Sequence, residues 1–353
     1  MVDENFLELA FQSEDIKSLF GNLDFMSCNG IPIKMCLFLM EEGSIQLIKN
    51  EEPKNVKRDI EILNEKEGIF RISFKLLNGS GDEQISKGII FRYPGTEKIF
   101  FYVSFSKSNI FEKIIKNYFN KFYPKVSRIF LTSNNLYKMI ECIKEKYDKE
   151  VFISKMVVKR KDREQIDVEY KKEKVSYKKA FEEAKLENKI IKSVNISTDD
   201  LDAYISRLAI FRLNKGSFST FSEDLLKQVL HFVDDEEKLL SNREQSEETN
   251  YKAKPLIINF SYNIFESVTN LREFKDELTK MKNISYNIIH FNPYLQMSIT
   301  DTRDGSTFNI WVLSKDSILI FPQFRSTFAS LSKFISAIFE RFSEGKISEF
   351  KYE

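Results

Sequence analysis

The sequence has little cysteine and histidine and only one tryptophan. Three cysteines (Cys28, Cys36 and Cys142) and two histidines occur among 353 residues. Three widely spaced cysteines cannot build a disulfide framework, which indicates a reducing compartment. His231 and His290 have no partner at the spacing of metal ligands, so neither a zinc site nor a histidine-dependent catalytic triad is expected.

Long apolar runs are also missing. The longest uninterrupted one, Met35 to Met40, is far shorter than the roughly 20 residues that cross a bilayer. The N-terminus carries Asp3 and Glu4 where a secretory signal needs basic residues. These absences predict a cytoplasmic protein without a membrane partner.

The chain has no strong net charge, but its charges are unevenly distributed. The formal net charge is +1, so no overall field attracts or repels a polyanion. Residues 1–106 carry 12 basic and 17 acidic side chains, whereas residues 107–179 carry 20 basic and 10 acidic ones. The middle of the chain is therefore a basic region with an acidic region before it.

Composition and length favour a folded protein of several domains. The sequence is 42% hydrophobic and 30% charged, which is typical of a folded globular protein. A chain of 353 residues is longer than those that usually fold around a single hydrophobic core. Strand and helix patterns alternate irregularly, which predicts an α+β protein with mostly antiparallel sheets, each covered by helices. The expected division is an N-terminal α+β domain (1–150), a basic hairpin with a helical middle region (151–245), a linker (246–254) and a C-terminal domain (255–353).

The C-terminal domain has the clearest pattern. A strand over 256–260 precedes a helix that contains Leu271, Phe274 and Leu278, and four short strands follow between Tyr286 and Phe321. A last amphipathic helix carries Phe334, Phe339 and other apolar residues, and Gly345 stands where a C-cap glycine is expected. The predicted order is β-α-β-β-β-β-α.

The hairpin in the middle of this domain has a predictable register. If Thr302 to Gly305 form the turn, Ile299 faces Phe308 and Met297 faces Ile310 on one apolar side, which should pack on the helices. The opposite side is polar with a single aromatic ring. It is a candidate ligand or interface face, made of Gln296, Ser298, Asn309 and Trp311.

The basic middle region is a candidate nucleic-acid interface. A hairpin is expected between 151–158 and 166–170, with helices over 177–190 and over 220–240, the second starting at a capping box of Thr220 and Glu223. Clustered lysines with interleaved tyrosines suit phosphate contact and base stacking. The candidate residues are Lys155, Lys159, Arg160, Lys161, Arg163, Lys171, Lys172 and Lys174.

Two short motifs suggest chemistry. Glu169 and Lys171 share one face of a strand, as in metal-dependent nucleases of the PD-(D/E)xK kind, where a further acid such as Asp162 would complete the site. Alternating charges on an exposed strand explain the same residues without catalysis. Lys215-Gly216-Ser217 resembles the end of a phosphate-binding loop, but the upstream glycine of that motif is missing.

These patterns favour a non-catalytic binding or scaffolding subunit of a larger complex. We expect a protein partner, nucleic-acid contact through the basic region, and neither cofactor nor metal. A metal-dependent nuclease and a ligand sensor that uses the Trp311 face remain alternatives. A microbial defence role is a further hypothesis that rests on no particular residue, and the oligomeric state stays open.

Overall fold

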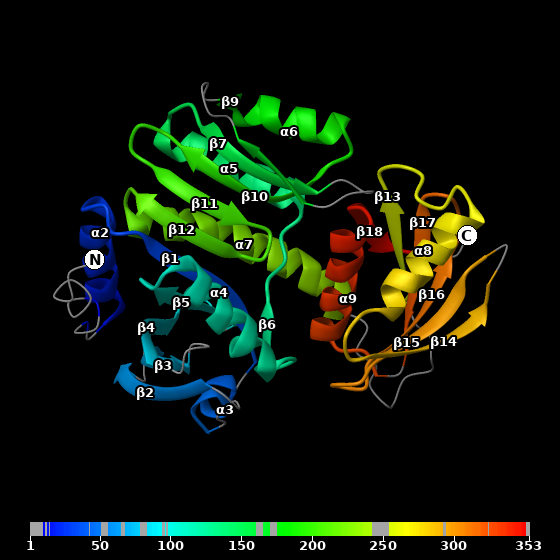
Figure 1. Ribbon diagram of the computed structural model, residues 1–353, viewed down its shortest axis with the longest axis horizontal. Helices are drawn as coiled ribbons and strands as arrows, with labels where there is room; N and C mark the ends of the chain where they lie inside the picture. Colours follow the sequence, from blue (N-terminus) through cyan, green and yellow to red (C-terminus); the bar gives the residue numbers. More distant parts are fainter. Residues whose placement is uncertain are drawn as a thin grey trace. The chain divides into compact units, whose positions relative to one another are not determined.

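The structure is a computed structural model that describes residues 10, 13, 15–41, 43–50, 56–64, 68–77, 83–93, 96, 98–159, 165–169, 175–241, 254–291, 294–323 and 325–350. The chain divides into two compact units, each with an antiparallel sheet and helices (Figure 1). The N-terminal unit comprises Met1–Lys159 and Glu164–Val229, and the C-terminal unit comprises Arg160–Arg163 and Leu230–Glu353. The predicted α+β class with antiparallel, helix-covered sheets is confirmed.

The N-terminal unit is built on one large sheet. Its strands are β1 (Ile33–Met40), β2 (Val56–Asn64), β3 (Ile69–Leu77), β4 (Glu83–Arg92), β5 (Ile99–Ser104), β6 (Val126–Arg128), β7 (Phe152–Lys159), β8 (Gln165–Glu169), β9 (Val175–Ser176), β10 (Ile190–Ser197), β11 (Asp202–Ser206) and β12 (Ile210–Lys215). They are ordered β2-β3-β4-β5-β1-β12-β11-β10-β7-β8, with β6 paired to β1 and β9 paired to β7.

The two halves of this sheet meet at strand β1. It pairs with β5 on one side and with β12 on the other, so residues before and after position 150 share one sheet. The predicted boundary at residue 150 therefore does not separate two sheets. Strands β10, β11 and β12 lie in a region that was expected to be helical, although the alternating apolar residues of β11 and β12 are typical of strands.

Helices cover both faces of the sheet in this unit. They are α2 (Ile16–Cys28), α3 (Ser44–Asn50), α4 (Ser108–Asn117), the 3₁₀ turn η1 (Phe119–Phe122), α5 (Ser133–Tyr147), α6 (Tyr177–Leu186) and the start of α7 (Phe218–Ser241). On the α4 face, Phe74 packs its ring against Tyr118 (centroids 4.8 Å apart) and Tyr102 (6.1 Å). On the opposite face, Phe20 of α2 contacts Phe91 and Phe218.

Predictions for this unit are confirmed in part. The hairpin of β7 and β8 and the helix α5 occur where the pattern indicated. Helix α7 begins at Phe218 rather than at Thr220. The Thr220 amide donates a hydrogen bond to the Ser217 hydroxyl at 3.2 Å, so Ser217 caps the first turn. The expected helix over 177–190 ends at Leu186, and the chain enters β10 at Ile190.

The C-terminal unit contains the predicted order of elements. Its strands and helices are β13 (Leu256–Phe260), α8 (Val268–Thr279), β14 (Ile284–His290), β15 (Gln296–Asp301), β16 (Thr307–Val312), β17 (Ser317–Pro322), α9 (Phe328–Arg341) and β18 (Gly345–Glu349). The sheet order is β14-β15-β16-β17-β13-β18. The interpretation of Gly345 as a helix cap was wrong: it opens β18, where an added Cβ would lie 2.6 Å from the Asn259 carbonyl oxygen.

The inner face of this sheet packs on the helices. Ile299 pairs with Phe308 and Met297 pairs with Ile310, as the register predicted, and all four side chains are buried. Phe334 of α9 stacks on Phe308, with ring centroids 5.6 Å apart. Because side chains alternate along a strand, residues 296, 298, 309 and 311 must lie on the other face of the sheet.

Candidate binding face

The four residues of the predicted face form one block on the outer side of the C-terminal sheet. Gln296 lies opposite Trp311, and Ser298 lies opposite Asn309, on the neighbouring strands β15 and β16. Directly opposed residues of an antiparallel pair point to the same side, so these four side chains adjoin. Trp311 is 37% exposed, whereas Met297 and Ile310 on the inner face are fully buried.

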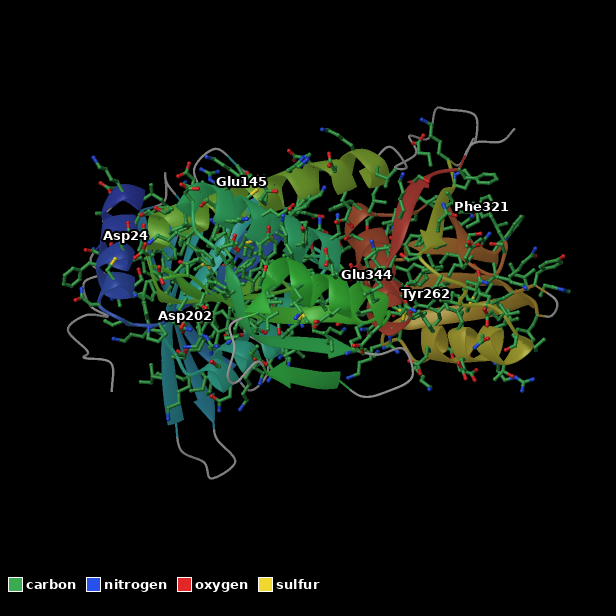
Figure 2. The ribbon with its side chains drawn as sticks, turned by 90° about the horizontal axis from the view of Figure 1, so that it is seen from above. Asp24, Glu145, Asp202, Tyr262, Phe321 and Glu344 are labelled. Carbon is green, nitrogen blue, oxygen red and sulfur yellow. The ribbon has the colours of Figure 1, made fainter. Side chains whose placement is uncertain are left out.

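Trp311 belongs to an apolar band that the sequence did not reveal. It lies opposite Leu319 on β17, and Leu319 lies opposite Ile257 on β13. The Trp311 ring contacts the Phe321 ring at a centroid distance of 4.6 Å, and Figure 2 labels Phe321 in this unit. Strand β17 is apolar on both faces, so alternation gave no sign of which of its residues share a side with Trp311.

The outer face carries almost no charge. Among the described strand residues on this side, the ionisable ones are His290 on β14 and Lys346 on the edge strand β18. The remainder are amides, hydroxyls and apolar groups. A surface without clustered cations lacks the main source of affinity for a phosphate backbone.

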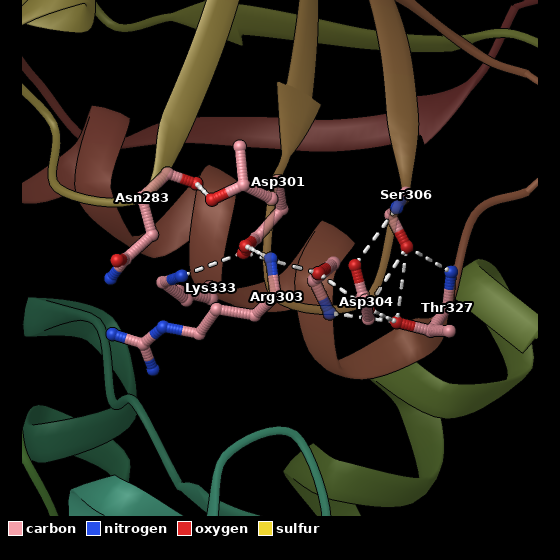
Figure 3. A network of polar contacts seen from close by, with 9 residues as sticks. Asn283, Asp301, Arg303, Asp304, Ser306, Thr327 and Lys333 are labelled. Atoms are coloured by element: carbon pink, nitrogen blue, oxygen red, sulfur yellow. Dashed lines mark hydrogen bonds and ion pairs between the residues drawn. The ribbon is translucent and has the colours of Figure 1, made fainter.

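A polar network fixes the hairpin that carries Trp311 (Figure 3). The Asp304 carboxylate accepts hydrogen bonds from the hydroxyls of Thr327 (2.6 Å), Ser330 (2.8 Å) and Ser306 (3.0 Å), and from the Ser306 amide (2.8 Å). These bonds attach the turn between β15 and β16 to the first turn of α9. They stabilise the strand register and, with it, the side on which Trp311 lies.

The second acid of the network is paired with a lysine. Asp301 is buried and accepts from the Lys333 ammonium at 2.7 Å. Burial alone would raise the pKa of Asp304, but the hydrogen bonds from Thr327, Ser306 and Ser330 outweigh it and hold that pKa below its usual value. Both carboxylates are engaged within the fold, and they act as structural groups.

The described residues contain no group of three His, Cys, Asp or Glu side chains that could hold a metal ion. His231 lies on α7 with its Nδ1 3.6 Å from the Asp235 carboxylate, a pair on successive turns that the sequence search did not identify. Both side chains are exposed. The pair has the geometry of a surface contact.

The nuclease motif is described only in part. Glu169 is the last residue of β8 and lies opposite Lys155 on β7. Asp162 and Lys171 lie outside the described residues. The proposed nuclease site of Glu169, Lys171 and Asp162 therefore stays a prediction.

The basic candidates are also described in part. Lys155 and Lys159 lie on β7, on the same face of the sheet. Arg160, Lys161, Arg163, Lys171, Lys172 and Lys174, together with most of the predicted linker 246–254, lie outside the described residues. Contact between these cations and nucleic acid stays a prediction.

The segment that resembled a phosphate-binding loop has a structural role. Lys215 ends β12 and Phe218 begins α7, so a strand, a short loop and a helix do follow one another. The Asp24 carboxylate of α2 accepts from the Ser217 hydroxyl and the Ser219 amide, both at 2.9 Å, and from the Ser219 hydroxyl (Figure 2 labels Asp24). A carboxylate of the chain thus already occupies the anion position at this helix N-terminus.

Comparison with known proteins gives no family assignment. The chain matches no protein-family profile and no curated protein sequence. None of the helices in the described part of the chain is both long and apolar enough to span a bilayer.

Proposed function

We propose that this protein is a non-catalytic binding protein that holds a protein partner on the outer face of its C-terminal sheet. The observation that carries the proposal is the composition of this face. A partly exposed Trp311 backed by Phe321 lies among neutral amides and hydroxyls. Protein interfaces are typically depleted of charge at their centre and anchored by aromatic side chains, whereas a nucleic-acid surface needs cations.

The same face is rigid enough to act as a preformed surface. It is built on paired strands, and the Asp304 network ties its hairpin to α9. A site on a regular sheet loses little conformational entropy when a partner binds. The favourable free energy of binding would come from removing the exposed part of Trp311, and of the half-buried Phe321 and Ile257, from water.

Trp311→Ala should weaken binding of the partner about 30-fold or more, the effect of losing a central aromatic anchor. The partner is obtained by purifying the tagged full chain from its source cells and is then purified itself and titrated against the full chain by calorimetry. Phe25→Ala, which removes a ring that is 51% exposed on α2 of the other unit, is the matched control and should leave the dissociation constant unchanged.

The chain contains one tryptophan, so fluorescence reports on this face alone. The emission of wild-type protein should shift to shorter wavelength as the partner covers the ring. A partner that binds Trp311→Ala as tightly as wild type would contradict the proposal. So would self-association of the wild type that the substitution abolishes, since the occupant would then be a second copy of this chain.

A further inference from the structure

Two cations lie side by side in the sheet of the N-terminal unit, away from the Trp311 face. Lys34 on β1 is directly opposite Arg212 on β12 and, on its other side, directly opposite Ser104 on β5. The three side chains share the face that α4 covers, because Cys36 and Tyr102, two residues along, belong to the core on that face. Like charges in directly opposed positions destabilise a sheet.

Lys34 has a mostly buried side chain and no counter-charge among the residues that the structure describes. Its side chain is 9% exposed, and no hydrogen bond or ion pair joins it to the residues that the structure describes. Burial lowers the pKa of Lys34 below its usual value, and the positive charge of Arg212 lowers it further. A cation on a mostly buried side chain beside a second cation is favoured when an anion pairs with it.

Arg212 is only partly satisfied. Its buried Nε has no hydrogen-bond partner among the described residues, and its Nη1 lies 3.5 Å from the Ser108 hydroxyl. The guanidinium also lies over the Tyr204 ring, 5.5 Å from the centroid. The Arg212 side chain therefore extends from the sheet to the start of α4, and its guanidinium has N–H groups that can still donate hydrogen bonds to an anion.

The start of α4 is itself suited to an anion. The helix runs over ten residues from Ser108, its N-cap residue Lys107 makes no side-chain cap, and its first turn contains no acid. The Ile110 amide already donates to the Asn109 Oδ1 at 2.9 Å, and the Phe111 amide donates to the Lys107 carbonyl at 3.0 Å. The helix dipole and the amides before Ile110 are the part of this turn that favours a negative group. The Ser104 and Ser106 hydroxyls, 3.0 Å apart, lie in the segment that leads into it.

We propose that Lys34, Arg212 and the first turn of α4 bind a phosphate group. A lysine, an arginine fork and a helix N-terminus together supply more than two positive charges, which suits a phosphate better than a single carboxylate. The anion would offset the like-charge pair and use the unpaired Arg212 donors. Neither Lys34 nor Arg212 belongs to the basic region (107–179) that the sequence indicated, and none of the site residues is among the basic candidates named there.

The row of residues beyond Arg212 extends this site across the sheet. Arg212 lies opposite Tyr204, which lies opposite Asn195, which in turn lies opposite Lys155 on β7. An aromatic ring, an amide and a further cation beside a phosphate site suit the sugar and base of a nucleotide or the next unit of a nucleic-acid strand. The recognised chemistry in both cases is a phosphate ester.

The first test uses inorganic phosphate and the full chain, by calorimetric titration and thermal unfolding in a phosphate-free buffer. Phosphate should bind the wild type and raise its unfolding temperature. Lys34→Met should weaken binding about 10- to 100-fold, and Arg212→Gln should weaken it to a similar degree. Lys113→Met, which removes an exposed cation from the same helix, is the matched control and should bind as the wild type does.

Loss of folding would not imitate this result. Without phosphate, Lys34→Met should unfold at a temperature about 2–4 °C higher than the wild type, since one member of a directly opposed pair of like charges has been removed from a mostly buried position. Trp311→Ala should bind phosphate normally, so failure of this inference and failure of the proposed protein-binding face are distinguishable. Absence of phosphate binding by wild type, or equal binding by Lys34→Met, would overturn the inference.

The source of the phosphate is decided with two further probes, a nucleoside monophosphate and a short single-stranded oligonucleotide. A strand that follows the row to Lys155 should bind more tightly than the monophosphate, compete with inorganic phosphate and weaken steeply with salt. Tighter binding of the monophosphate than of the oligonucleotide assigns the site to a small phosphate ester. Either order of the two affinities supports the phosphate site. If Lys34→Met binds both probes as tightly as the wild type does, the phosphate site is contradicted.

Discussion

Phe334→Ala should destabilise the C-terminal unit by about 3–5 kcal/mol, the usual cost of removing a buried phenylalanine ring. Phe334 is 2% exposed and stacks on Phe308, so its loss leaves a cavity between α9 and the sheet. Calorimetric unfolding of the full chain measures the effect. The emission of the single tryptophan, which lies in this unit, identifies the transition that moves.

Trp311→Ala is the matched control for this prediction. Its ring lies on the outer face and is 37% exposed, so the loss should be below about 1.5 kcal/mol. Circular dichroism follows this variant, which has no tryptophan. If Trp311→Ala proved more damaging than Phe334→Ala, another part of the protein would have to cover the outer face, and the proposed partner surface would fail with it.

Asp304→Ala should destabilise the same unit by roughly 2–4 kcal/mol, because it leaves the donors of Ser306, Thr327 and Ser330 without their common acceptor. Asp304→Asn keeps one acceptor oxygen and should cost about half as much. Glu273→Ala, which removes an exposed carboxylate from α8, should have little effect. Denaturant titration gives the three values.

The Asp304 effect should also depend on pH. The pKa of this carboxyl is lower in the folded protein than in the unfolded chain, so the ionised form favours folding. Its contribution is fully present above the unfolded value, about 4, and is lost as the pH falls through the folded value. The difference in unfolding free energy between wild type and Asp304→Ala should therefore shrink below about pH 4. A difference that stays constant would show that the network depends on shape rather than on charge.

The sequence by itself determined the order of elements from β13 to α9 and the register of the β15–β16 hairpin, but it missed β18. Alternation in 295–301 and 307–312 specified which side chains face the helices, and the Asp304-Gly305 turn aligned the strands. It also placed Gln296, Ser298, Asn309 and Trp311 together. These properties depend on neighbours along the chain or across one tight turn, where spacing alone fixes the geometry.

The tertiary structure decided everything that depends on pairing between distant segments. Lys34 and Arg212 are 178 positions apart in the sequence and become neighbours only because β1 pairs with β12. Nothing near either residue indicates the other, since Lys34 lies in a strand that is apolar on both faces and Arg212 lies in a short alternating strand. Phe321 joined the Trp311 face in the same way, through the pairing of β16 with β17, whose own pattern is apolar on both sides. Long-range strand pairing depends on the packing of the whole sheet. The periodic pattern within one segment does not indicate which distant strand that segment pairs with.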